Sequence, residues 1–163
     1  MPPPASSGSA CAQHGREAGR RGRGIVVVRP GTRRAVLRRA GGRCEYCRTV
    51  GWPLTIDHVD PTRRGADADH ADNLAAACYP CNRLKWHRTA ADDPATGQAV
   101  RLFNPRTDDW EEHFTWGRGY LTILGWTDTG RATVRQLKLN REDRKRQRRL
   151  LRGAAEAGVV SWP

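Results

Sequence analysis

Two Cys-x-x-Cys pairs constrain the fold of this chain more than any other feature of its sequence. The pairs are Cys44 with Cys47 and Cys78 with Cys81. Thiolates two residues apart can turn back on one Zn²⁺ at about 2.3 Å each, and a second pair completes a tetrahedron. Four sulfur ligands leave no position for an activated water, so we expect a structural zinc. Any reaction would then fall to residues held between the two pairs.

The composition predicts one small domain with tails. The chain has 163 residues and 37% hydrophobic content, which is too little for a second core. No apolar run approaches the roughly 20 residues of a membrane span, and the first residues lack the order of a secretory signal. We therefore expect a cytoplasmic protein, where reduced thiols favour metal over disulfides. The fifth cysteine, Cys11, is expected to be an incidental thiol in a tail.

The charge predicts a polyanionic partner. There are 29 basic and 17 acidic residues, which gives a net charge of +12. Because each lysine or arginine laid along phosphates releases counterions, nucleic acid is the favoured partner. A solvated basic surface that serves solubility is the alternative.

Composition shifts divide the chain into three parts of an α+β protein. Residues 1–24 lack a hydrophobic period and predict a disordered basic arm. In the core, residues 25–92, we predict a strand at 25–28, a helix at 33–40 capped by Thr32, strands at 54–59 and 74–77, and a helix from Cys81 to about 92. In the extension, residues 93–163, we predict a helical turn at 108–114, a hairpin ending near 128 and a basic helix over 133–152. That last helix is a phosphate-binding candidate, and a solvated outer face is the alternative. The six tryptophans are expected to serve mostly in packing, and none is assigned to substrate.

Residues 33–90 resemble the HNH endonucleases of the four-cysteine zinc type. The likeness is carried by Cys44-Glu45-Tyr46-Cys47, Ile56-Asp57-His58-Val59, Pro61, Asp72-Asn73-Leu74 and Cys78-Tyr79-Pro80-Cys81-Asn82-x-x-Lys85. The resemblance implies a ββα-metal fold that holds one divalent cation against a scissile phosphate in DNA. It also implies His58 as the general base, with Asp57 and Asn82 as ligands of Mg²⁺ or Mn²⁺.

The chemistry of these residue types agrees with those roles. An imidazole, whose ordinary pKa is about 6.5, can take a proton from water at neutral pH. Carboxylate and amide oxygens suit hard cations, although an amide at Asn82 brings no charge. Neighbouring side chains in a strand point to opposite faces, so Asp57 and His58 share a face only if the strand ends or bulges there.

Further residues are expected around this centre. Asn73 would brace the 61–72 loop by hydrogen bonds to its backbone and so position His58. Arg63, Arg64 and Lys85 would contact phosphates, although Lys85 could instead only balance the end of its helix. His70 and His87 are left outside the metal site.

Two other functions remain open from the sequence. A zinc module that binds DNA or RNA without cutting it would need the same charge but none of Asp57, His58 and Asn82. A protein-interaction module in a larger assembly is the second alternative.

Overall fold

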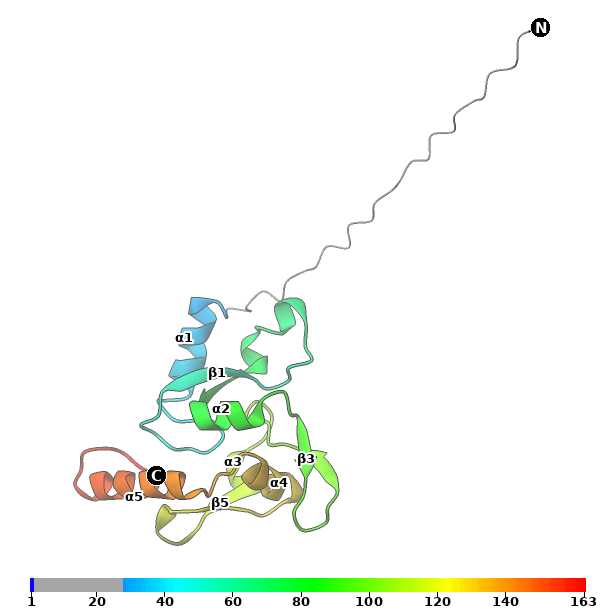
Figure 1. Ribbon diagram of the computed structural model, residues 1–163. Coiled ribbons are helices and arrows are strands. Elements are labelled where there is room, and N and C mark those ends of the chain that lie inside the picture. The colour runs from blue at the N-terminus through cyan, green and yellow to red at the C-terminus, as the bar shows by residue number, and fades with distance from the viewer. Residues whose placement is uncertain (2–27) are drawn as a thin grey trace.

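The computed structural model describes Met1 and residues 28–163. The arm predicted at 1–24 and most of the strand predicted at 25–28 lie outside the described residues. In Figure 1 a hairpin lies between helices α1 and α2, and the C-terminal elements gather on the far side of α2. The chain is a small α+β protein, as the sequence predicts.

The centre of the fold is a ββα unit. Strand β1 (Leu54–His58) pairs antiparallel with β2 (Leu74–Cys78), with Leu54 opposite Cys78 and His58 opposite Leu74. Helix α2 (Tyr79–Lys85) begins directly after β2, and Pro80 occupies its first turn. Proline fits there because the first amides of a helix have no partner inside it. The two strands therefore fall where the alternation predicts, and α2 begins two residues earlier than expected.

Helix α1 (Pro30–Arg39) covers one face of this hairpin. Its buried Val36 packs with Leu74 and Ala76 of β2. Every residue of β2 is buried, and its three central residues are alanines, so elements on both faces can approach closely. The helix begins at Pro30, and no side chain caps it, so the cap predicted at Thr32 is wrong.

Helix α2 ends at Lys85, well before the predicted end near residue 92. The chain reverses at Trp86, which has a φ of 52°. Strands β3 (Ala90–Asp92) and β4 (Ala99–Arg101) then form a hairpin that the sequence analysis missed. Buried Asp93 closes its turn by accepting bonds from the amide of Ala95 and the hydroxyl of Thr96. The helix is thus ended by a backbone reversal at a tryptophan, a residue type that does not predict a helix end.

The extension adds helix α3 (Trp110–His113) and a second hairpin, formed by β5 (Phe114–Trp116) and β6 (Ile123–Gly125). Helix α4 (Asp128–Gln136) crosses β6 so closely that a Cβ on Gly125 would collide with the backbone of Gly130 and Arg131. Short 3₁₀ turns complete the chain at Gly65–Asp67, Ala71–Asn73 and Arg118–Tyr120.

The single basic helix predicted over 133–152 is two helices. Helix α4 ends at Gln136, and α5 (Glu142–Glu156) starts after a bend. Leu137 and Leu139 are buried in that bend, and the side chain of Asn140 bonds to both backbone groups of Ile123. These core contacts and hydrogen bonds stabilise the bend in place of the backbone hydrogen bonds of a continuous helix.

The main core joins the ββα unit to the extension. It includes the four cysteines of the two pairs together with Phe103, Trp110, Phe114, Ile123 and Leu139. The indole of Trp110 donates to the carbonyl oxygen of Tyr46 at 3.0 Å. None of the helices in the described residues has the length and apolar character needed to cross a bilayer.

Candidate active site

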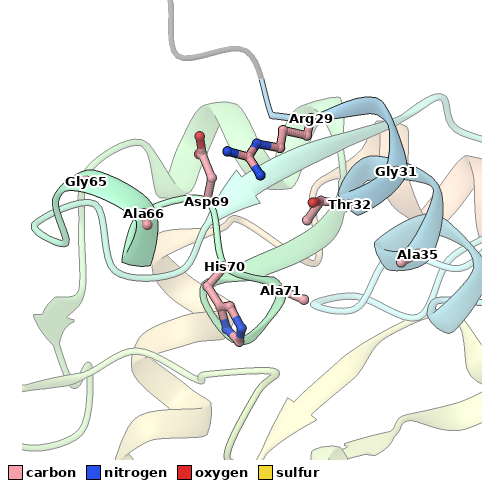
Figure 2. A pocket seen from close by; sticks show the side chains of 9 residues that line it. All are labelled: Arg29, Gly31, Thr32, Ala35, Gly65, Ala66, Asp69, His70 and Ala71. Atoms are coloured by element: carbon pink, nitrogen blue, oxygen red, sulfur yellow. The ribbon is translucent and has the colours of Figure 1, made fainter.

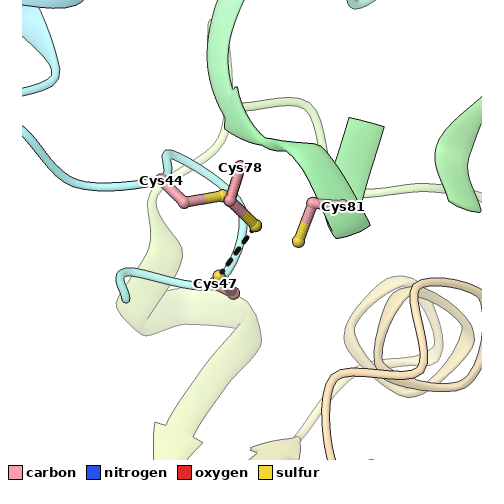
Figure 3. A group of neighbouring side chains, drawn as sticks. All are labelled: Cys44, Cys47, Cys78 and Cys81. Carbon is pink, nitrogen blue, oxygen red and sulfur yellow. Dashed lines mark hydrogen bonds between the residues drawn. The ribbon is translucent and has the colours of Figure 1, made fainter. Parts of the chain in front are cut away.

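The two cysteine pairs converge on one point. Cys44 and Cys47 lie in the turn after α1, Cys78 ends β2 and Cys81 lies in the first turn of α2. Their four sulfur atoms lie within 4.8 Å of one another, and Sγ of Cys47 is 3.9 Å from Sγ of Cys78 (Figure 3). A zinc with four bonds of about 2.3 Å places its sulfur ligands about 3.8 Å apart, so the cluster has the size of a zinc site. Among the described residues it is the one such group of cysteine, histidine and acidic side chains.

A guanidinium from α5 lies against this cluster. Nη1 of Arg144 is 3.2 Å from Sγ of Cys81, and its Nη2 donates to the carbonyl oxygen of Leu137 at 3.3 Å. Burial alone would lower the pKa of Arg144, but the thiolates of Cys81 and Cys47 outweigh it and raise the pKa. Four thiolates around a bound Zn²⁺ would carry a net charge of about −2, which the guanidinium would partly offset. The sequence does not predict this contact, because the basic helix expected over 133–152 would face phosphate or solvent.

The first cysteine turn also fixes the hairpin. The carboxylate of Glu45 accepts a bond of 2.6 Å from the amide of Ala76 in β2, and it pairs with Arg39 and Arg106. Because β2 leads directly into Cys78, Glu45 holds the two cysteine pairs in register.

Asp57 points into the interior from β1. Its Oδ2 accepts a bond of 2.6 Å from the hydroxyl of Tyr46 and lies 3.1 Å from Nζ of Lys85. The residue is 3% exposed. Burial raises its pKa, while the charge of Lys85 and the Tyr46 hydroxyl act in the opposite direction. The negative charge of the carboxylate is therefore largely balanced by Lys85.

His58 faces a different partner. Its Nε2 lies 2.9 Å from Oδ1 of Asp69 in the loop between the strands. Asp69 and Arg29 point into a hollow of about 740 Å³ between this loop and the start of α1 (Figure 2). The carbonyl oxygen of His58 accepts a bond of 2.8 Å from Lys85, so the backbone is fixed as well. Asp57 and His58 thus alternate as neighbours in a strand do, and Asp69 is a partner that sequence reasoning missed.

Asn73 ties the ends of the 61–72 loop together. Its Oδ1 accepts from the amide of Asp60 at 2.9 Å, and its Nδ2 donates to the carbonyl oxygens of Asp60 and Ala68 at 3.0 Å each. The side chain is buried, and the main-chain carbonyl oxygen of Asn73 accepts a bond from the amide of Val59. These bonds hold the chain on both sides of the turn that follows His58.

Asn82 lies on α2 with its amide nitrogen against β1. Nδ2 donates to the hydroxyl oxygen of Thr55 at 2.9 Å and to the carbonyl oxygen of Ile56 at 3.2 Å. Since a carbonyl can only accept, the nitrogen must be the atom that faces Ile56. The Oδ1 atom is left for another partner, which is the orientation a metal ligand requires.

A hollow of about 450 Å³ collects these groups. It is lined by Asp57, His58, Tyr79, Asn82, Arg83, Trp86 and His87. A helix continuing past Lys85, as the sequence predicts, would place His87 off this face. The reversal at Trp86 brings His87 back, and no residue type in that segment signals such a reversal.

Comparison with known proteins agrees with this arrangement. The family model described as HNH endonuclease matches residues 44–88. This segment is an HNH domain. No curated protein and no solved structure matches the chain. The match begins at the first cysteine of the cluster and ends just after the hollow.

The basic residues assigned to phosphate lie in different settings. Arg63 and Arg64 are exposed in the loop of the HNH domain, where Arg64 donates to the carbonyl oxygen of Pro61 at 3.0 Å. Lys85 is not placed to contact phosphate as expected, because it is 1% exposed and pairs with Asp57. On α5, Arg144 and Arg148 are buried, so that part of the predicted phosphate-binding face turns inward.

Proposed function

We propose that this protein is an endonuclease that hydrolyses phosphodiester bonds in DNA with a divalent cation. One observation carries the proposal. His58 and Asp57 of β1 and Asn82 of α2 line the same hollow of the HNH domain. These are a proton acceptor and two hard oxygen donors, the groups that metal-assisted hydrolysis of a phosphate diester needs.

His58 would act as the general base through Nδ1. A carboxylate accepts but does not donate, so the 2.9 Å contact with Asp69 places a hydrogen on Nε2 of the neutral ring. Nδ1 is then the atom that can remove a proton from an attacking water. Asp69 would keep the ring in this tautomer and would stabilise the imidazolium that forms.

Asp57 and Asn82 would hold the catalytic Mg²⁺ or Mn²⁺. An ionised carboxylate has about four lone-pair sites. At Asp57 the Tyr46 hydroxyl takes one site and Nζ of Lys85, 3.3 Å from Oδ1 and 3.1 Å from Oδ2, takes one on each oxygen, so one site remains. When bound, the cation would neutralise charge that builds up on the phosphate and the leaving oxygen. Because Lys85 already offsets the charge of the carboxylate and Asn82 is uncharged, we expect weak metal binding. Cleavage should then need the metal ion in large excess over the protein.

The remaining assignments follow from the same geometry. Zn²⁺ on the four cysteines would be structural, since no ligand position stays open. Arg63 and Arg64 are offered to the DNA backbone from the loop beside His58, and the +12 net charge would favour binding at low salt. Asn73 would act by positioning the loop.

A plasmid-nicking assay with Mg²⁺ or Mn²⁺ tests the proposal. His58→Ala should lower the rate by about 10²–10⁴-fold, because a general base contributes that much. The matched control is His70→Ala, an exposed histidine of the same loop that should cut as the native protein does. Asp69→Asn should lie between the two. Equal cutting by native protein and His58→Ala would refute the role of His58.

One observation favours a second candidate, a zinc-stabilised module that binds nucleic acid without cutting it. The charge of Asp57 is already paired with that of Lys85, without a metal ion. Binding of plasmid with no cutting by the native protein, at any Mg²⁺ or Mn²⁺ concentration, would favour this alternative.

A further inference from the structure

Trp86 occupies a backbone conformation that is costly for a large side chain. It follows the last residue of α2 with φ 52° and ψ −128°. Bulky residues at positive φ are outliers, and such strain persists mostly where function uses it. Its amide still donates to the carbonyl oxygen of Asn82 at 2.9 Å, so the conformation is fixed by the helix end. A glycine would adopt it without strain.

The indole also gains little from burial. Trp86 is 67% exposed, and its ring meets the ring of His87 edge to face with centroids 4.6 Å apart. Tyr79, which is 58% exposed, lines the same hollow from the start of α2. Two large aromatic side chains are therefore exposed to solvent beside His58 and Asn82.

The surroundings indicate what such rings would meet. Arg83 lines the hollow with them, and Arg88 is exposed just after it. An aromatic face bordered by cations suits a nucleobase attached to a phosphate backbone better than an apolar peptide. In a duplex both faces of a base are covered by its neighbours, so stacking on a protein ring requires an unstacked base.

We propose that Trp86 stacks on a nucleobase next to the scissile phosphate, and that the preferred substrate is DNA with unpaired nucleotides. Single strands, flaps and bubbles would then bind better than an intact duplex of the same sequence. This inference rests on the proposed function for its choice of nucleic acid as the ligand. It assigns a substrate class and a specificity-determining residue to that site.

Binding measured without added Mg²⁺ or Mn²⁺ separates this inference from cleavage. The probe is a fluorescent 20-nucleotide DNA strand, compared with its duplex by anisotropy at constant salt. The native protein should prefer the single strand. Trp86→Gly, which relieves the backbone strain and so should fold, is expected to bind the single strand about tenfold to a hundredfold more weakly, with duplex affinity unchanged.

Two matched variants sharpen the result. Trp86→Phe keeps an aromatic face and should retain most of the single-strand affinity. Trp126→Ala removes a tryptophan that is 64% exposed but does not line the hollow, and it should bind as the native protein does. Equal affinity of the native protein for strand and duplex, or native single-strand affinity in Trp86→Gly, would overturn the inference. A native protein that binds strands through Trp86 but cuts no DNA would instead overturn the proposed function alone.

Discussion

Replacing Arg144 by glutamine should weaken zinc binding although Arg144 is not a ligand. The guanidinium is 4% exposed and lies 3.2 Å from Sγ of Cys81 and 4.0 Å from Sγ of Cys78. A buried hydrogen bond to a charged group contributes about 1.5–3 kcal/mol. Since about 1.4 kcal/mol is tenfold, the loss corresponds to about a 10- to 150-fold weaker affinity. Losses of about 10- to 100-fold are also typical of groups that support metal ligands from behind.

Competition with a chromogenic zinc chelator measures this affinity directly. The matched control is Arg146→Gln, two residues along α5, where the side chain is exposed. Arg144→Lys keeps the charge and should recover part of the loss. Circular dichroism of the zinc-loaded proteins shows whether each variant is folded. If Arg144→Gln and Arg146→Gln hold zinc equally well while both are folded, the electrostatic reasoning is wrong.

Two further predictions concern ion pairs inside the fold. Lys85→Met should destabilise the protein by about 3–5 kcal/mol in urea unfolding, because it leaves Asp57 buried without its cation. The double variant Asp57→Asn/Lys85→Met should recover part of that loss, and a double variant as unstable as the sum of both singles would contradict the pairing. Asp93→Asn should lower the melting temperature at pH 7, because two bonds from Arg131 hold the pKa of Asp93 well below its usual range. An unfolded aspartate titrates near pH 3.9, so this contribution is present above about pH 4 and fades as the pH falls below it. Melting curves between pH 7 and pH 2 would refute the assignment if the gap between variant and native protein stayed constant.

Short-range patterns predicted the centre of the fold well. The Cys-x-x-Cys spacing and the alternation at 54–59 located the cluster and β1, since both depend on neighbours a few residues apart. The ββα unit followed from the same segment, and the family match covers it.

The features that the sequence analysis missed depend on contacts between distant segments. Arg144 meets Cys81 across 63 residues, and Asp69 meets His58 through a loop whose path no periodicity describes. The bend after α4 forms because Asn140 finds backbone partners in β6. Local propensity cannot report such gains, so one long helix was predicted there.

Lys85 illustrates the same limit at the site itself. The sequence predicts that this lysine contacts phosphate or balances the end of its helix. The fold buries it against Asp57 instead, and this changes the expected strength of metal binding.

The most direct test of the central claim is single-turnover DNA cleavage as a function of Mn²⁺ concentration. It separates the proposed ligand from the proposed base. Asn82→Ala should require more Mn²⁺ for half-maximal rate, because it removes an oxygen donor. His58→Ala should lower the maximal rate about 10²–10⁴-fold without moving the half-maximal concentration. Full activity of His58→Ala, or an unchanged Mn²⁺ requirement in a folded Asn82→Ala, would contradict the account.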